Sequence, residues 1–246
     1  MASSRRRRSD SHRGDAPYPD SREPKLQTTT LWYHPSQQYG DERMGTPGYE
    51  GATPAYVIWN LIQRYTRPDD LVVDPFCGGG TTLDVARKLE RRALGYDLRP
   101  VRDDIFRADA RKLPLEDGKA DFVFMDPPYS THIEYSDDPD CIGKLDSFEE
   151  PYFEAMDAAF AEAERVLKDR RYIGVYVSDT YKKKRGFVPI GFRLAMLLEK
   201  RFRWVDQITV VRGNRKLSEG RFHKAAAEGN FFLRGYNHLL LFKKER

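Results

Sequence analysis

Two short loops constrain the fold of this chain more than any other feature of its sequence. The first reads Asp-Pro-Phe-Cys-Gly-Gly-Gly-Thr-Thr over 74–82 and follows the apolar run 71–73. The second reads Asp-Pro-Pro-Tyr over 126–129 and follows the apolar run 122–125. A short apolar run that ends in turn residues is typical of a strand buried on both faces. The two loops therefore predict an open sheet with a ligand site at its strand ends.

Strands and helices alternate along the rest of the chain. We expect seven strands, at 71–73, 93–96, 105–106, 121–125, 172–177, 205–211 and 238–242. The alternation predicts an α/β fold, a Rossmann-like and mostly parallel seven-stranded sheet with helices on both faces. The long connection 212–237 contains no convincing helix, so we expect the last strand to pair antiparallel.

Residues that favour helix starts precede two of the expected helices. Thr53 suits an N-cap and Pro54 suits the first helical position. The run Ser-Phe-Glu-Glu at 147–150 has the form of a capping box and predicts a helix that starts there.

Composition predicts a single domain behind a short tail. Residues 1–25 are rich in Arg, Ser, Asp and Pro and are expected to be a disordered basic tail. Residues 26–246 are expected to form one domain with small recognition insertions at 130–146, 178–189 and 212–237. No apolar run approaches the roughly 20 residues that span a bilayer, and no signal peptide is visible. Two distant cysteines fit a reducing cytoplasm, without a disulfide or metal site.

Most of the net positive charge lies in the tail. The chain carries a net charge of +4, and residues 1–25 hold seven positive and four negative side chains. The body is therefore nearly neutral, so any affinity for nucleic acid must come from local patches.

The first loop is suited to a nucleotide-like cofactor. Its glycines permit positive φ angles and a close approach of the backbone to a ligand. It lacks the Gly-Lys-Thr of a phosphate loop and the glycine spacing of a dinucleotide site. Asp74 can accept a hydrogen bond from a ligand amine. Asp97 ends the second strand, where it can bind two ribose hydroxyls, and Asp109 ends the third, where it can meet an adenine amino group.

The second loop is suited to the amine of a planar substrate. Pro127 and Pro128 stiffen the backbone and remove two donors, so the Pro127 carbonyl is a fixed acceptor beside Asp126. These two acceptors can bind both protons of an exocyclic NH2 group and stabilise the charge that develops as its nitrogen attacks a methyl group. Tyr129 can stack on the ring, and a base in a duplex must flip out to reach such a pocket.

At these residues the chain resembles the class I S-adenosylmethionine-dependent methyltransferases of the DNA adenine-N6 and cytosine-N4 group. Residues 74–82 match the family's cofactor motif, 126–129 match its catalytic motif, and Thr53-Pro54 resembles the motif that contacts the methionine carboxylate. The resemblance spans about 50–245 and implies S-adenosylmethionine as the cofactor. It implies the catalytic residues Asp126, Pro127, Pro128 and Tyr129. It implies the cofactor-binding residues Thr53, Pro54, Asp74, Pro75, Phe76, Cys77, Gly78, Gly80, Thr81, Asp97, Leu98, Asp109 and Ala110.

The resemblance implies methyl transfer to the exocyclic amine of a flipped DNA base. The acid at 126 favours adenine N6, because many cytosine-N4 enzymes carry Ser there. The small recognition insertions leave RNA open as the polymer, and a nucleic-acid-binding protein without turnover is a further alternative. Carbon-5 methylation of cytosine does not fit, since Cys77 lies in the cofactor loop and Cys141 follows Asp140. The sequence does not distinguish a monomer from a homodimer.

Two basic segments lie where a nucleic-acid backbone is expected to pass. One follows the fifth strand and the other follows the sixth. We favour phosphate contacts for both. The residues concerned are Lys182, Lys183, Lys184, Arg185, Arg212, Arg215 and Lys216.

Overall fold

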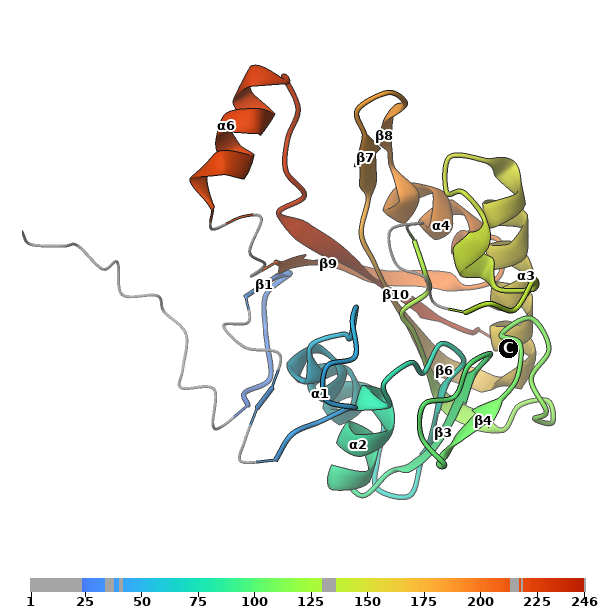
Figure 1. Cartoon of the computed structure of the whole chain (residues 1–246). Coiled ribbons are helices and arrows are strands. Elements are labelled where there is room, and N and C mark those ends of the chain that lie inside the picture. Colours follow the sequence, from blue (N-terminus) through green and yellow to red (C-terminus); the bar gives the residue numbers. More distant parts are fainter. Residues whose placement is uncertain are drawn as a thin grey trace, which may run out of the picture.

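The computed structural model describes residues 24–33, 38–39, 42–129, 136–212, 217 and 219–245. These residues contain an eight-stranded sheet (Figure 1). In spatial order its strands are β1 (Leu31–Tyr33), β9 (Arg203–Val211), β10 (Tyr236–Lys243), β6 (Leu167–Val177), β5 (Ala120–Met125), β2 (Leu71–Asp74), β3 (Arg92–Asp97) and β4 (Ile105–Arg107).

The predicted fold class is confirmed, with one strand more than expected. All pairs from β6 to β4 are parallel. β10 is antiparallel to both β6 and β9, as predicted for the last strand. The additional strand β1 pairs parallel with β9 at the sheet edge. Its three residues are too few to show a clear alternation in the sequence.

Helices cover both faces of the sheet. α1 (Ala55–Tyr65) and α2 (Thr81–Lys88) lie on one face, and α3 (Glu150–Val166) and α4 (Ile190–Glu199) lie on the other. β5 is buried along its whole length, because alternate side chains enter the two cores. None of the described helices is long and apolar enough to span a membrane.

Two local expectations are wrong. The capping box does not form, because α3 begins at Glu150 after the N-cap Glu149, with no side-chain cap. The stretch 178–189, predicted as a recognition insertion, contains the hairpin of β7 (Thr180–Lys182) and β8 (Gly186–Val188). The connection 212–237 contains the helix α6 (Gly220–Glu228). Much of α6 is exposed, so it lacks the apolar periodicity that identifies a core helix.

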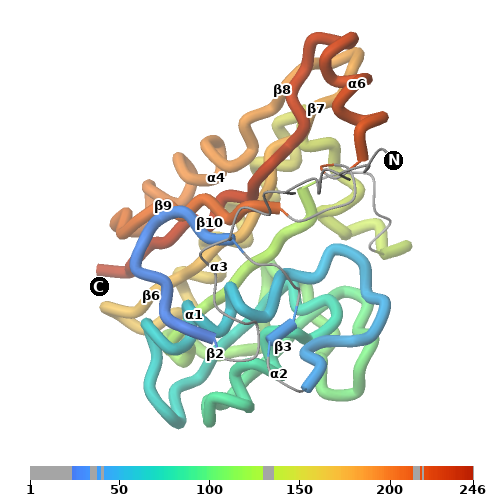
Figure 2. The backbone as a smooth tube through the Cα atoms, turned by 90° about the vertical axis from the view of Figure 1, so that its left-hand side faces the viewer, coloured from blue at the N-terminus to red at the C-terminus, as the bar shows by residue number. Residues whose placement is uncertain are grey.

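The hairpin and α6 project beyond the same edge of the sheet, as Figures 1 and 2 show from two directions. Ring contacts join the hairpin to the segment before β10. The Tyr181 and Phe231 rings stack with centroids 5.1 Å apart, and the Arg234 guanidinium lies 5.0 Å from the Phe187 ring centroid. The predicted insertion 130–146 contains the short helix η1 (Ile142–Lys144), and residues 130–135 lie outside the described part.

The order of the strands in the sheet predicts where a ligand binds. The chain runs from β2 outward through β3 to β4 and then returns to β5 on the other side of β2. In open parallel sheets, ligands bind at the carboxyl ends of the strands beside such a reversal. Both loops singled out from the sequence follow strands at this point.

Candidate active site

The first loop forms a tight turn between β2 and α2. Gly78 and Gly80 have φ angles of 50° and 82°, a left-handed conformation that glycine adopts without strain. The Cys77 amide donates to the Tyr96 carbonyl oxygen at 2.9 Å, which fastens the turn to β3. The turn therefore holds its backbone against a pocket at the carboxyl ends of β2 and β3.

Asp74 holds this turn with its own carboxylate. Oδ1 accepts a hydrogen bond from the Phe76 amide at 3.0 Å, and Oδ2 accepts one from the Thr82 hydroxyl at 2.5 Å. Burial raises the pKa of Asp74 to about 7, although these hydrogen bonds lower it. Its contact with a ligand amine stays a prediction, and its observed contacts shape the loop.

Asp97 and Asp109 follow the next two strands and line the same pocket. Asp97 Oδ2 accepts from the Gly78 amide at 2.9 Å, so the end of β3 and the glycine turn are linked. Burial raises the pKa of Asp97. Asp109 pairs with Arg111, whose Nη2 lies 2.6 Å from Oδ2. A carboxylate oxygen accepts more than one hydrogen bond, so both acids retain capacity for a ligand.

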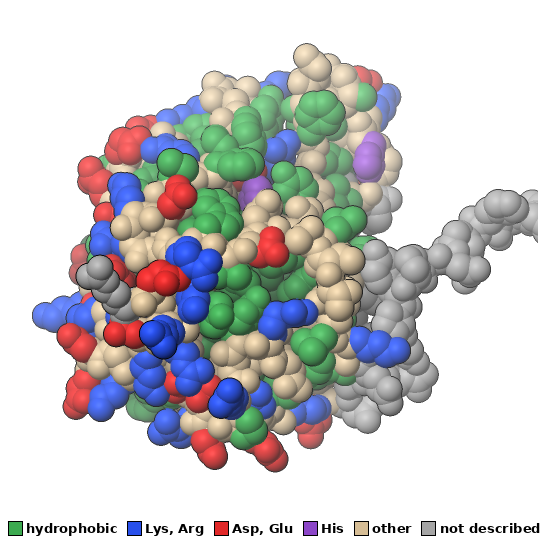
Figure 3. Space-filling model, turned by 180° about the vertical axis from the view of Figure 1, so that it is seen from behind, with side chains coloured by type: hydrophobic (Ala, Val, Ile, Leu, Met, Phe, Trp, Pro, Cys, Tyr) green, Lys and Arg blue, Asp and Glu red, His purple; other side chains and the backbone are tan. Residues whose placement is uncertain are grey.

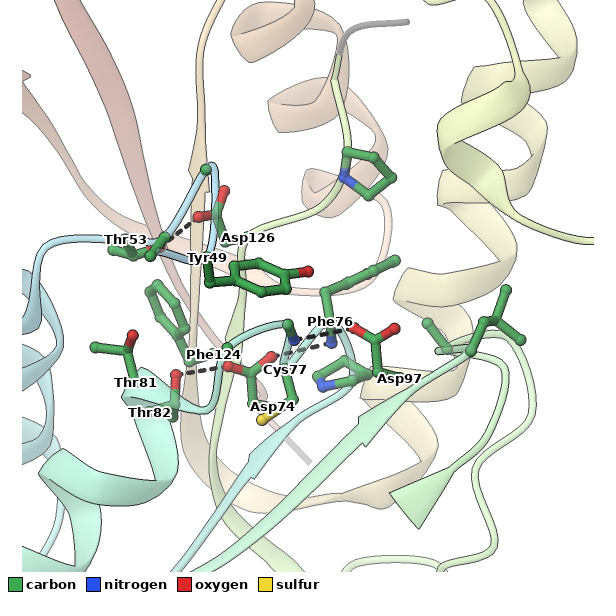
Figure 4. A pocket seen from close by; sticks show the side chains of 18 of the residues that line it. Tyr49, Thr53, Asp74, Phe76, Cys77, Thr81, Thr82, Asp97, Phe124 and Asp126 are labelled. Carbon is green, nitrogen blue, oxygen red and sulfur yellow. Dashed lines mark hydrogen bonds between the residues drawn. The ribbon is translucent and has the colours of Figure 1, made fainter. Parts of the chain in front are cut away.

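Tyr49 is a pocket residue that sequence reasoning missed. Its chain segment crosses the glycine turn, where the Thr46 amide donates to the Gly79 carbonyl oxygen at 2.7 Å. A Cβ on Gly78 would lie 2.8 Å from the Tyr49 ring, so the ring rests on the turn. Figure 4 shows it between Asp126 and Asp97. Burial, followed by the charge of Asp97, raises the pKa of Tyr49 to about 12.

The second loop brings Asp126 to the wall of this pocket. The Thr53 hydroxyl donates a hydrogen bond to Asp126 Oδ2 (Figure 4). Burial raises the pKa of Asp126 to about 8; the Thr53 bond lowers it, and the charge of Asp74 raises it further. The N-cap predicted at Thr53 is wrong, because Pro54 is the N-cap residue of α1 and the Thr53 hydroxyl binds Asp126 instead.

The rest of the second loop is packed tightly. Pro127 and Pro128 are buried, and Pro128 lines the pocket. Tyr129 packs on the core beneath α3 and α4. Burial, with the charge of Asp126 adding to it, raises the pKa of Tyr129 to about 12, so its hydroxyl is neutral at physiological pH.

The pocket gathers most of the residues predicted from the two motifs. The predicted residues that line it are Thr53, Asp74, Pro75, Phe76, Cys77, Gly78, Thr81, Asp97, Leu98, Asp109, Ala110, Asp126 and Pro128. The predicted residues that do not line it are Pro54, Gly80, Pro127 and Tyr129. The lining residues outside the predicted motifs are Tyr49, Gly51, Ala52, Ile58, Ala108, Phe124, Ser136, Cys141 and Ile142.

These additional residues come from the arm before α1, from α1 itself, from the residue after β4, from the interior of β5 and from the segment 136–142. Their apolar and small side chains carry no local signal of function, since the same residue types fill ordinary cores. Among the described residues, no group of three or more His, Cys, Asp or Glu could hold a metal ion.

The first basic segment is balanced by acids of the same surface. Asp146 pairs with Lys182 at 3.2 Å and with Arg185 at 2.8 Å, and Arg185 also pairs with Glu149. Figure 3 likewise shows acidic and basic side chains interspersed over one face of the molecule. Lys183 and Lys184 are exposed. Their contact with phosphate stays a prediction.

Arg212, from the second basic segment, lies near enough to the second loop for its charge to act on two of the loop's side chains. Its Nη1 donates to the Ser178 hydroxyl oxygen at 3.0 Å. Its positive charge lowers the pKa values of Asp126 and Tyr129. The other two predicted residues of this segment, Arg215 and Lys216, lie outside the described residues.

Comparison with known proteins agrees with the first motif. Residues 2–107 match the N6/N4 family of DNA methylases. A stretch of 71 residues is 34% identical to the Type II methyltransferase M1.MboII of Moraxella bovis and covers 28% of this chain and 27% of that protein. A stretch of 44 residues is 43% identical to the Type II methyltransferase M2.DpnII of Streptococcus pneumoniae and covers 18% and 16%. The chain thus matches about a quarter or less of the length of these curated relatives.

Solved structures share the fold. TrmN from Thermus thermophilus superposes with a TM-score of 0.52 at 18% identity, over 79% of this chain and 50% of that one. The [4+2]-cyclase SpnF superposes with a TM-score of 0.51 at 15% identity, over 82% and 87%. Since one of these is a cyclase, the fold alone does not specify the reaction.

Together, the matches confirm the resemblance to N6/N4 DNA methyltransferases and agree with S-adenosylmethionine as the cofactor. The family match ends before Asp126. The case for the second loop therefore rests on its sequence and its position at the pocket wall.

Proposed function

We propose that this chain transfers a methyl group from S-adenosylmethionine to the exocyclic amine of a base flipped out of DNA, with adenine N6 favoured over cytosine N4. The observation that carries the proposal is the position of Asp126. Its carboxylate lies at the wall of the pocket that also contains the glycine turn and Asp97. One pocket therefore holds the groups for the cofactor and an acceptor for the amine.

The pocket residues fit the parts of S-adenosylmethionine. Asp97 would bind the ribose hydroxyls, because its carboxylate is already aligned by the Gly78 amide and faces the pocket. Asp109 would accept from the adenine amino group. The Gly78 and Gly79 backbone would lie along the ligand, beside the Tyr49 ring that lines the same pocket. The bound cofactor supplies a methyl group on a positively charged sulfur, and the sulfur keeps the electron pair of the broken carbon–sulfur bond.

Asp126 would act on the target amine. An aromatic amine is a weak nucleophile, because its lone pair is delocalised into the ring. Acceptance of its two N–H groups by the Asp126 carboxylate and the Pro127 carbonyl favours a tetrahedral nitrogen with an available lone pair. As that lone pair forms the nitrogen–carbon bond, the nitrogen becomes positive and releases one proton. The Asp126 carboxylate is placed to stabilise this charge and to receive the proton.

The raised pKa of Asp126 predicts a pH-dependent difference in stability between the wild type and Asp126→Asn. An unfolded aspartate has a pKa of about 4, and folded Asp126 has a pKa of about 8. The folded state binds the proton more tightly, so the stability that this carboxyl contributes is complete below about pH 4 and is lost as pH rises through 8. We expect Asp126→Asn to melt roughly 5 °C above the wild type at about pH 9 and close to it at about pH 5.

Calorimetric melting curves across this pH range measure the difference. Asp103→Asn, at an exposed position, is the matched control and should follow the wild type at every pH. A stability advantage of Asp126→Asn that shrinks as pH rises would contradict the burial of an ionisable carboxyl.

Assays with labelled methyl groups test the proposed reaction and its polymer. We expect transfer to duplex DNA, with N6-methyladenine identified by mass spectrometry of the hydrolysed nucleosides. Structured RNA of similar length serves as the parallel substrate, and labelling of RNA alone would replace DNA as the target. Cofactor binding without transfer to either polymer would favour the alternative of a binding protein that retains the fold.

A further inference from the structure

A row of polar side chains continues from Asp126 across the sheet on the face covered by α1. Side chains alternate between faces along a strand. Phe122 and Phe124 enter the core on the α1 face, so Asp126 shares that face. Tyr176 on β6 belongs to the same core. Asn237, two residues before Leu239 on β10, and Arg212, two residues after Val210 at the end of β9, point to it by the same alternation.

Direct contacts join two pairs of residues in or beside this row. Arg212 Nη1 donates to the Ser178 hydroxyl oxygen at 3.0 Å, and Ser178 is fully buried. The Asn237 side chain hydrogen-bonds Tyr176, whose pKa is raised by burial and then by the charge of Asp126. Within the described residues, the buried Asn237 Oδ1 has no hydrogen-bond partner. The row is therefore a polar surface that starts at the proposed reacting group and is buried at Tyr176, Ser178 and Asn237.

Arg212 is the cation of this row. Its charge acts on the Asp126 carboxyl, on Tyr129 and on Tyr176, and lowers the pKa of each. The Arg212 guanidinium is directed inward, because it hydrogen-bonds a fully buried hydroxyl and its charge acts on three groups around one site. A side chain reaching for the phosphate backbone would extend outward instead.

We propose that Arg212, held by Ser178, is a positioning residue that favours the anionic form of the Asp126 carboxyl at the methyl-transfer site. The proposal rests on the function proposed above and adds a residue outside both motifs. An anionic carboxylate accepts hydrogen bonds from both amine protons and stabilises the positive nitrogen, whereas a protonated carboxyl does neither well.

The other groups around Asp126 in the described part of the chain carry no positive charge that could favour its anionic form. From β2, Asp74 disfavours a second negative charge. From the arm and from β6, Tyr49 and Tyr176 are neutral phenols with raised pKa values. Tyr129, in the loop of Asp126, is neutral as well. Thr53 donates one hydrogen bond to the carboxylate. Arg212 is the one cation that the described residues bring to bear on Asp126.

Direct titration of Asp126 tests the charge effect without any substrate. In protein labelled with 13C at aspartate carboxyl carbons, the Asp126 signal is assigned by its loss in Asp126→Asn. We expect Arg212→Gln to raise the pKa of Asp126 by about one unit, and Ser178→Ala to raise it less. Arg212→Lys retains the charge and should leave the titration close to that of the wild type. An unchanged titration in Arg212→Gln overturns the proposal, whether or not the protein methylates DNA.

The pH profile of methyl transfer tests the consequence for the reaction. For Arg212→Gln we expect kcat on duplex DNA to fall about tenfold on the acidic side of the pH profile and to recover at high pH. Arg212→Lys should restore the kcat of the wild type on the acidic side. Loss of a phosphate contact alone would weaken DNA binding and lower its salt dependence without changing the acidic side of the pH profile, and that result overturns the proposal. A wild type inactive on DNA and RNA refutes the proposed function, while the titration still decides the effect of Arg212.

Discussion

Asp126→Ala should abolish methyl transfer and leave cofactor binding nearly unchanged. The substitution removes the acceptor for one amine proton and the negative charge that stabilises the developing cation. Loss of one preorganised group of this kind costs about 10²–10³ in kcat, and Asp126 also receives the proton, so we expect a fall of about 10³-fold or more. Single-turnover transfer of a labelled methyl group to duplex DNA measures it.

Two controls make this result specific. Asp126→Asn retains a neutral acceptor oxygen at the same position and should keep part of the activity, above that of Asp126→Ala. Calorimetric titration with S-adenosylhomocysteine should give similar dissociation constants for the wild type and both variants, which shows that the pocket is still folded. Methylation by Asp126→Ala at the rate of the wild type would refute the role assigned to the second loop.

Asp97→Ala should have the largest effect on the cofactor. It removes the carboxylate proposed to bind the ribose hydroxyls and also the acceptor that aligns the Gly78 amide at 2.9 Å. Hydrogen bonds to a charged group contribute about 1.5–3 kcal/mol each. We therefore expect the dissociation constant of S-adenosylmethionine to rise about 100-fold, which corresponds to about 2.7 kcal/mol.

Equilibrium dialysis with the labelled cofactor measures this change. Asp109→Ala is the internal comparison, because the Asp109 carboxylate is already paired with Arg111. It should weaken binding by about tenfold or less. A dissociation constant for Asp97→Ala equal to that of the wild type would show that the ribose lies elsewhere in the pocket. Circular dichroism melting curves separate a lost contact from a lost fold.

The fold was predictable where local sequence and tertiary environment agree. The apolar runs before each loop identify buried strands, since a strand covered on both faces has no polar positions. The predictions failed where the environment overrides local preference. Ser147 does not cap α3, and Thr53 does not cap α1, because its hydroxyl lies beside Asp126. A residue that favours capping can hydrogen-bond the backbone at a helix start. Tertiary contacts decide whether its side chain makes that bond or binds another partner.

The site was predictable to a similar degree. Consecutive residues of one loop stay together in any fold, so the glycine turn and the second loop were identified directly. Tyr49 was missed, because its place on Gly78 results from the path of a distant segment. Arg212 was predicted to contact phosphate from its charge and its position after the sixth expected strand, and that contact stays a prediction. Its neighbours are Ser178 and the Asp126 site, which belong to other strands of the sheet.

The sequence by itself determined the residues of the two loops, their order and the parallel sheet that carries them. Those properties depend on residue type and local spacing, and both can be read directly from the sequence. Only the tertiary structure decided that Asp74 shapes its own turn, that Thr53 binds Asp126 and that the charge of Arg212 acts on the same carboxyl. These contacts depend on strand order and on which face each side chain takes, and neither is encoded in the residues next to them.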